Sequence, residues 1–282
     1  MTKRFVTLAW SAAACAYLLV VLGAVVRVTG SGMGCGDHWP SCNGHLFPPL
    51  NDIPTVIEWS HRLVAGVVSV LVAGLALLGW RGAGSLEPGA RAAAYTAVAL
   101  LIVQVLLGAV TVKTGLTPVL VILHLGTAML LLATLIAAAR APWLPTPDSW
   151  LPISLAFLTV LFGALTANLG AMASCGGFPL CNGQLIPTAG PLAWVQWIHR
   201  LLAYSLAGYL IWWMARDQRR AGWVLGIVLL QITIAATMVL SGFPSGLQVA
   251  HVGVGAAVWA AIVIAAVTKK ADPSVSSTPP SS

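Results

Sequence analysis

Apolar residues run along this chain in eight long stretches, which are separated by short segments that are polar or rich in glycine and proline. The stretches cover roughly residues 5–28, 57–80, 91–113, 117–140, 150–170, 193–215, 220–241 and 247–268. Each is about 20 residues long, which is the length an α-helix needs to cross the hydrocarbon core of a bilayer. The pattern therefore predicts an all-α, polytopic membrane protein with eight transmembrane helices.

Composition supports this assignment and excludes two other classes of protein. Of the 282 residues, 59% are hydrophobic and only 7% are charged, whereas about 25% of the residues of a soluble domain are charged. The net charge of +7 suggests a nucleic-acid partner at first sight, but the cations are scattered at the ends of the apolar stretches. That distribution is typical of membrane topology, so we expect a lipid bilayer as the partner and no nucleic acid.

Basic residues predict the orientation of the helices. Four of the fourteen Lys and Arg residues fall on one side of the bilayer, namely Arg27, Arg62, Lys113 and Arg200. The other ten fall on the opposite side, namely Lys3, Arg4, Arg81, Arg91, Arg140, Arg216, Arg219, Arg220, Lys269 and Lys270. Because basic residues accumulate on the cytoplasmic side, we expect a multi-pass protein of the cell membrane with both termini in the cytoplasm. The two long loops, roughly 29–56 and 171–192, then face outward.

The chain contains an internal repeat. "SCNGHLFP" at 41–48 returns as "LCNGQLIP" at 180–187, "WSHRL" returns as "WIHRL", and "HLG" returns as "HVG". Four helices bring the chain back to its starting side, so both copies have the same orientation and a pseudo-two-fold axis along the membrane normal relates them. We therefore predict two tandem four-helix bundles. They comprise residues 1–141 and 150–268, joined by a cytoplasmic linker at 142–149 and followed by a disordered cytoplasmic tail at 269–282.

Four of the six histidines belong to the repeated motifs. His61 matches His199 and His124 matches His251, and all four are expected near the outer ends of their helices. Two histidines at one depth on facing helices can bind a heme iron axially, and the interior of a helix bundle is a usual place for such a cofactor. The alternative is that the histidines only form hydrogen bonds between helices. Four ionisable residues in two duplicated pairs within the membrane favour the heme-ligand interpretation.

Other residues near these histidines have candidate roles in the same sites. Arg62 and Arg200 directly follow two of the histidines and are candidates for contacts with heme propionates. Gly126 and Gly253 follow the other two histidines, and we expect small residues there to leave room for a flat macrocycle. Gln104 and Gln231 lie in the middle of apolar stretches, where hydrogen bonds between helices are the expected role. Zinc is a poor candidate because no HExxH or CxxC spacing is present.

The two copies differ at one position of chemical interest. Glu58 lies three residues before His61, on the same helix face, and the second copy has Gln196 there. A carboxylate beside a heme can take up protons or stabilise positive charge, and an amide does this poorly. The alternative is that Glu58 caps the start of its helix. The first outer loop also has Asp37 and His38, which the second lacks.

Cysteines occur in pairs in the two outer loops. Cys35 and Cys42 lie in the first loop, and Cys175 and Cys181 lie in the second. An outward compartment permits disulfides, and closing such a short loop costs little entropy, so we predict a Cys35–Cys42 and a Cys175–Cys181 disulfide. Cys15, inside the first apolar stretch, is expected to be a small buried residue.

Taken together, these motifs closely resemble the heme A synthase family. The resemblance rests on "RVTGSGMGCGDHWPSCNG", "EWSHR", "QVLLGAVTVKTG" with a later "HLG", "CNGQLIP" and "IHRLLAY", and it covers nearly all of residues 1–268. Members of this family oxidise the C8 methyl group of heme O to a formyl group by successive hydroxylations and so provide heme A for terminal oxidases. The resemblance implies heme O as substrate, heme A as product, and heme O synthase and an electron acceptor as candidate partners.

The resemblance also implies a role for each candidate site residue. His61 and His124 would hold the iron of the substrate heme, and His199 and His251 would hold the iron of a resident heme b. Glu58 matches a glutamate that is essential in the family, and Cys35 and Cys42 match its outer-loop pair. We therefore take Glu58, Cys35 and Cys42 as the candidate catalytic residues. The residues alone leave open whether the cysteines carry electrons, react covalently or only brace the loop.

Three other functions are compatible with part of these features. A bis-histidine, di-heme cytochrome b that only transfers electrons would explain the histidines but not the difference between Glu58 and Gln196. A membrane thiol oxidoreductase would explain the cysteines, although their spacing is not the CxxC of such enzymes. A heme carrier without chemistry is the third.

Overall fold

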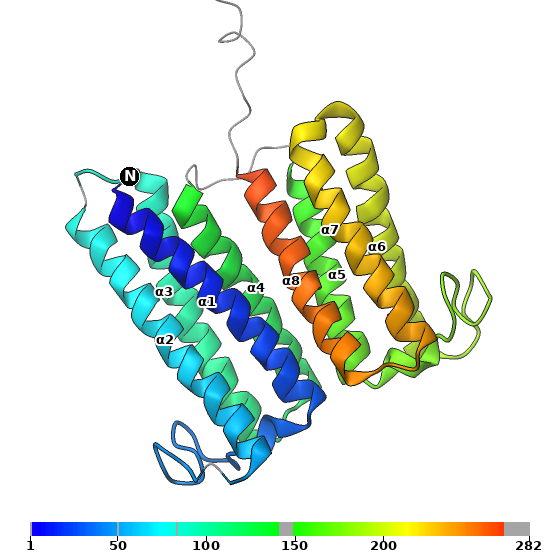
Figure 1. The fold of residues 1–282 in the computed structure, drawn as a ribbon, viewed down its shortest axis with the longest axis horizontal. Coiled ribbons are helices and arrows are strands. Elements are labelled where there is room, and N and C mark those ends of the chain that lie inside the picture. The colour runs from blue at the N-terminus through cyan, green and yellow to red at the C-terminus, as the bar shows by residue number, and fades with distance from the viewer. Residues whose placement is uncertain (1, 50, 83, 141–148, 268–282) are drawn as a thin grey trace, which may run out of the picture.

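The architecture is a set of eight α-helices, seen here in a computed structural model that describes residues 2–49, 51–82, 84–140 and 149–267 (Figure 1). The helices are α1 (Lys3–Val28), α2 (Ile53–Arg81), α3 (Pro88–Lys113), α4 (Pro118–Arg140), α5 (Trp150–Asn168), α6 (Pro191–Arg216), α7 (Gln218–Leu240) and α8 (Ser245–Ala266). Two short 3-10 helices, η1 (Ser31–Met33) and η3 (Ala171–Ser174), begin the outer loops. The expected tail and nearly all of the expected linker lie outside the described residues.

The all-helical, membrane-spanning prediction is confirmed, with one difference. Seven of the eight described helices are long and apolar enough to cross a membrane, and α6 is the exception. Its 26 residues provide sufficient length, but it contains four tryptophans, two tyrosines, Gln196, His199 and Arg200, which lower its hydropathy. Because α6 packs between α5 and α7, it lies alongside the spanning helices and turns its polar residues into the protein.

The helices form two groups in space, α1–α4 and α5–α8, which are called the first and the second bundle below (Figure 1). Helices α1–α4 lie together on one side of the molecule and α5–α8 on the other, and both long loops leave from the same end. Small residues permit close packing inside the first group, with Ala9, Ala12, Ala13 and Ala16 on α1 all buried. A stripe of small residues at this helical spacing lets neighbouring backbones approach each other, which is how helices associate within a bilayer.

Helices α1 and α4 of the first group contact α5 and α8 of the second. At this contact the buried Trp259 indole donates a hydrogen bond to the carbonyl oxygen of Met129 at 2.8 Å, and the Tyr17 hydroxyl donates to that of Gly253 at 3.1 Å. The expectation that Gly126 and Gly253 make room for a macrocycle is wrong. A Cβ on Gly126 would lie 3.0 Å from Leu161 on α5, and one on Gly253 would lie 3.5 Å from Val21 on α1, so both glycines serve the contact between the groups.

The outer loops share one local structure, which explains the repeated "CNG". In the first loop Asn43 and Gly44 both have positive φ, and the backbones of Cys42 and His45 exchange hydrogen bonds across them. Asn-Gly is the preferred pair for such a tight turn because both central residues must adopt left-handed conformations. The second loop repeats the turn between Cys181 and Gln184. In each loop the turn places the second cysteine against the first, and both predicted disulfides are present.

Candidate functional site

The four repeated histidines occupy matching places in the fold. His61 and His199 are each the ninth residue of their helices, α2 and α6, and His124 and His251 are each the seventh residue of α4 and α8. At 1.5 Å per residue this places them about 12 Å and about 9 Å inside the outer helix ends. Both pairs therefore lie about two turns from the end of their bundle that carries the long loop.

In the second bundle the two histidine rings face each other. The ring centroids of His199 and His251 lie 6.2 Å apart, with nearly perpendicular planes. The His199 Nδ1 lies 2.9 Å from the carbonyl oxygen of Thr159 on α5, and the Gln231 amide nitrogen lies 3.0 Å from the His251 Nδ1. The expected role of Gln231 as a hydrogen-bonding residue between helices is confirmed.

In the first bundle the rings of His61 and His124 each lie against a glycine of a neighbouring helix. The His61 ring lies against Gly23 of α1, and the His124 ring lies against Gly108 of α3. The Gln104 amide nitrogen lies 3.2 Å from the His124 Nε2, so Gln104 also bonds between helices as expected. Both Nδ1 atoms in this pair are buried and lack a hydrogen-bond partner within the described chain.

The second pair fits an axially bound iron. Metal–imidazole bonds of about 2.0–2.1 Å, plus roughly 1 Å from each nitrogen to its ring centre, place two axial rings about 6 Å apart. The observed separation of 6.2 Å matches this value. No group of three or more His, Cys, Asp or Glu side chains able to hold a metal ion occurs among the described residues.

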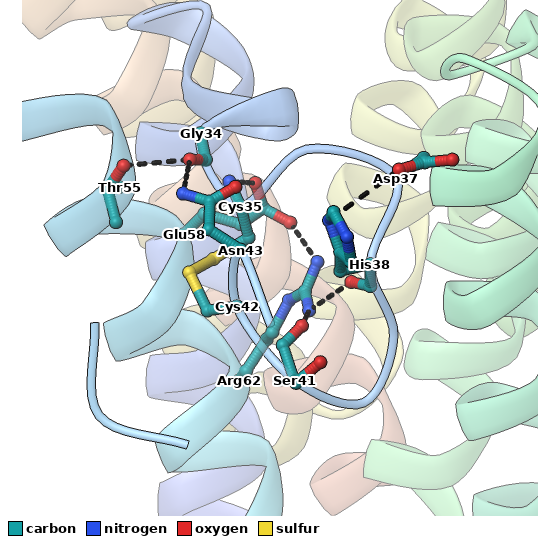
Figure 2. Close-up of polar contacts among 10 residues, drawn as sticks. All are labelled: Gly34, Cys35, Asp37, His38, Ser41, Cys42, Asn43, Thr55, Glu58 and Arg62. Atoms are coloured by element: carbon teal, nitrogen blue, oxygen red, sulfur yellow. Dashed lines mark hydrogen bonds and ion pairs between the residues drawn. A yellow bond between two sulfur atoms is a disulfide. The ribbon is translucent and has the colours of Figure 1, made fainter. Parts of the chain in front are cut away.

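Glu58 lies at the centre of a polar cluster beneath the first outer loop (Figure 2). Its side chain is 4% exposed, and one carboxylate oxygen accepts a hydrogen bond from the Cys35 backbone N–H at 2.8 Å. The other oxygen pairs with the guanidinium of Arg62, which also donates to the carbonyl oxygens of His38 and Ser41, both at 2.7 Å. Glu58 thus connects the first disulfide loop to α2 and aligns Arg62.

Glu58 does not cap its helix. Asp52 is the N-cap of α2, and its carboxylate accepts the Thr55 backbone N–H at 3.0 Å. Hydrogen bonds from the Thr55 side chain and backbone lower the pKa of Asp52 below its usual value. The helix-cap alternative for Glu58 is therefore wrong, because the helix begins at Ile53, earlier than the apolar pattern indicates.

The second bundle arranges the corresponding residues differently. Gln196 is equally buried, but its side-chain oxygen has no hydrogen-bond partner in the described part of the chain. Arg200 compensates by donating directly to the carbonyl oxygens of Cys175 and Leu180, both at 2.7 Å, and of Gly177 at 3.0 Å. The second loop is thus fastened without a carboxylate, so loop attachment does not in itself require Glu58.

Both arginines proposed to contact propionates donate hydrogen bonds to carbonyl oxygens of the loops. Arg62 and Arg200 hold the backbone that carries each disulfide, and this fastens each loop to the helix that bears His61 or His199. Asp37 and His38, the extra polar residues of the first loop, have side chains that are 72% and 55% exposed and contact each other at 3.6 Å. The contribution of His38 to the cluster is its carbonyl oxygen (Figure 2).

Sequence reasoning missed the glycines and the carbonyl that contact the histidine rings. Gly23 and Gly163 lie at matching places on α1 and α5, offset by the same 140 residues that separate Cys35 from Cys175. This offset is the signal that could have identified them, because a repeated glycine inside a helix at a repeated site indicates close approach of another group. The role of the Thr159 carbonyl could not be found in this way, because every residue has a backbone carbonyl and residue types do not show which one is used.

We expect all four loop cysteines to resist alkylation in the purified, unreduced protein. All four are no more than 2% exposed and form two disulfides, whereas Cys15 is free and only partly buried. Mass spectrometry after alkylation in denaturant should find label on Cys15 alone. Reduction before alkylation is the control and should add label at the four loop positions. Label on the loop cysteines without reductant would contradict the pairing.

Comparison with known proteins gives consistent matches. Residues 6–54 and 53–263 match the COX15-CtaA family model, described as a cytochrome oxidase assembly protein. A heme A synthase of Shouchella clausii is 35% identical over 209 residues, covering 67% of this chain and 68% of the relative. One of Halalkalibacterium halodurans is 31% identical over 250 residues, covering 80% and 83%. One of Bacillus licheniformis is 43% identical over 122 residues, covering 43% and 40%.

Proposed function

Because the chain belongs to the COX15-CtaA family of cytochrome oxidase assembly proteins, we infer that it is a heme A synthase, an oxidoreductase that converts the C8 methyl group of heme O to a formyl group. Heme O is the substrate and heme A is the product, and the reaction takes place in a membrane. The observation that supports this best is the pairing of four histidines at one depth with a buried carboxylate beside one pair only.

We assign different tasks to the two bundles. His199 and His251 would hold a resident heme b, which supplies a one-electron relay when bound. His61 and His124 would hold the iron of the substrate heme. The chemistry is assigned to the first bundle because it contains Glu58, whereas the matching residue of the second bundle is the amide Gln196.

The residues of the first bundle then position the substrate and its protons. His61 and His124 orient the macrocycle by holding its iron from two helices. Each hydroxylation breaks a C–H bond of the methyl group and forms a C–O bond. With water as the source of oxygen, two electrons pass to the electron acceptor and two protons are released, so the site needs a proton acceptor and a stabiliser of positive charge. Glu58, held between the Cys35 N–H and Arg62, is the buried anion available for both tasks. The Cys35–Cys42 disulfide keeps the N–H donor in place, so we assign it a positioning role.

Orientation in the membrane is also a proposal. Of the four basic residues expected on the outer side, Arg62 and Arg200 bind loop carbonyls and Arg27 donates to Gln248 at 3.4 Å across the contact between the bundles. These hydrogen bonds explain why the three arginines lie on the outer side. The ten basic residues on the opposite side support cytoplasmic termini in the cell membrane. We propose two partners: heme O synthase supplies the substrate, and a separate electron acceptor takes up the electrons that the oxidation releases.

We expect the chain to produce heme A when it is expressed in a host that makes heme O and lacks heme A. Extracted hemes should be separated by chromatography and identified by mass, with His61→Ala as a matched inactive control. A protein that purifies with heme but yields no heme A or hydroxylated heme O would instead be an electron-transfer cytochrome. A protein that binds heme O and returns it unchanged would be a carrier.

A further inference from the structure

We propose that the carbonyl oxygen of Thr159 locks His199 in a ligating orientation, and that Gly163 makes this contact possible. We infer further that this lock is why the second bundle retains its heme while the first can exchange substrate for product. The inference rests on the proposed binding of heme by the two histidine pairs. It assigns a positioning role to residues of α5, which do not themselves bind the iron.

The hydrogen bond determines which nitrogen of His199 is available. The Nδ1 lies 2.9 Å from the Thr159 carbonyl oxygen, and a carbonyl oxygen can only accept, so Nδ1 carries the hydrogen. A neutral imidazole has one N–H, so Nε2 presents its lone pair, as iron ligation requires. Metal-binding histidines commonly donate their second nitrogen to a carbonyl or carboxylate, which fixes the ring and increases its basicity.

Gly163 is needed for the ring to come this close. Residues 159 and 163 are separated by about one turn of α5, so the side of the helix that offers the Thr159 carbonyl also presents residue 163. A Cβ at position 163 would lie 2.9 Å from the His199 Cε1 and 3.3 Å from its Nδ1. Carbon atoms in proteins do not approach this closely, and the opposing atoms belong to the ring itself. An alanine there would push the ring away from the Thr159 carbonyl.

The first bundle has the glycine but not the lock. Gly23 occupies the matching place on α1, and a Cβ there would lie 3.3 Å from the His61 Cε1. The His61 Nδ1 nevertheless has no hydrogen-bond partner within the described chain, although it is buried. Its ring can therefore turn without losing a hydrogen bond, whereas the ring of His199 cannot.

The second histidine of each pair contacts the amide nitrogen of a glutamine, which can only donate. The Gln231 amide nitrogen lies 3.0 Å from the His251 Nδ1, so this Nδ1 accepts, and the lock of the second bundle is confined to His199. The Gln104 amide lies instead at the Nε2 of His124, against the atom that iron needs. A heme that enters the first bundle must displace the Gln104 amide and must also fix the ring of His61, which no hydrogen bond at Nδ1 holds in place. Both requirements reduce affinity there, which suits a site that must release its product.

The test compares Gly163→Ala with the matched variant Gly23→Ala in the full-length protein. Retained heme and the rate of heme transfer to an excess of a heme-free globin should be measured for each. Loss of partners that orient a metal ligand typically costs about 10–100-fold in affinity, so Gly163→Ala should transfer its retained heme about 10–100-fold faster. Gly23→Ala should transfer that heme at the rate of the unaltered protein.

A second measurement separates a lost lock from general damage. Heme that stays bound in Gly163→Ala should have a higher reduction potential, because an imidazole without its Nδ1 acceptor stabilises ferric iron less. Should this variant fail to fold, judged by alkylation of Cys175 and Cys181, the unaltered protein decides instead, because the lock requires the heme of the second bundle to transfer about 10–100-fold more slowly than heme O bound in the first.

The outcomes distinguish this inference from the proposed function. His199→Ala tests ligation itself, and retention of heme by that variant would overturn the proposed assignment of the retained heme to His199 and His251. If His199→Ala loses its heme while folded Gly163→Ala matches the unaltered protein in heme transfer and potential, the lock is overturned and the proposed function stands. Faster transfer in both Gly163→Ala and Gly23→Ala would also overturn the lock, because it would not be specific to the second bundle.

Discussion

Glu58→Gln is expected to abolish heme A formation while leaving the retained heme and both disulfides intact. The substitution keeps the size of the side chain and removes the negative charge beside the substrate histidines. Removing an electrostatic interaction that stabilises a transition state typically reduces the rate by about 10²–10³. We expect a reduction of this size, because positive charge would develop at the methyl carbon within a poorly solvated site.

The folded chain itself indicates that glutamine is tolerated at this position. Gln196 occupies the matching place in the second bundle, is equally buried, and lies beneath an intact disulfide loop. At position 58 the amide oxygen can still accept from the Cys35 N–H, as the carboxylate does now. Loss of the ion pair with Arg62 leaves two bonds from that arginine to loop carbonyls, so the loop should remain attached.

The measurement is chromatography of hemes extracted after expression with heme O, together with the optical spectrum of the purified protein. The reciprocal variant Gln196→Glu is the matched control, because it adds a carboxylate beside the second arginine and should leave heme A formation unchanged. Heme A at the level of the unaltered protein in Glu58→Gln would refute a catalytic role. Loss of retained heme or loop cysteines open to alkylation would show that Glu58 is structural.

Replacing the histidines is expected to separate the two bundles. His199→Ala or His251→Ala should remove the retained heme almost completely, because one imidazole cannot hold a low-spin, six-coordinate iron. His61→Ala or His124→Ala should keep that heme and stop heme A formation, since only the substrate site is altered. The four variants are well matched, as each histidine has a counterpart at the same place in the other bundle.

Low-spin heme spectra and heme content per polypeptide provide the readout for this series. A full low-spin spectrum after His199→Ala or His251→Ala would contradict the assignment of the retained heme to these two histidines. Loss of that spectrum in His61→Ala would reverse the roles of the bundles. The disulfides serve as the folding control in every variant, because no hydrogen bond in the described part of the chain joins these histidines to the loops.

Much of this protein could be read from its sequence because the relevant signals are local. A helix that crosses a bilayer is predominantly apolar, so the eight helices and their approximate positions follow from the apolar pattern, although α2 begins at Ile53, before its apolar stretch. The sequence also determined which histidines match, because a repeat preserves the distance from each motif to its helix end. Both disulfides followed from their short loops. Only α6 departed from the pattern, since its polar and aromatic residues are buried among its neighbours.

Contacts between helices were decided by the tertiary structure alone. Gly126 and Gly253 look like cofactor-pocket residues from their spacing to a histidine, yet they face the other bundle, because spacing along a helix does not determine which neighbour packs there. Glu58 and Gln196 differ by one side-chain atom, and only packing shows that the Glu58 carboxylate accepts the Cys35 N–H whereas the Gln196 side-chain oxygen has no partner in the described chain. Whether a histidine ring reaches a carbonyl depends on tenths of an ångström between two helix backbones. Such distances follow from the packing of every side chain between the two helices, and no local pattern in the sequence specifies them.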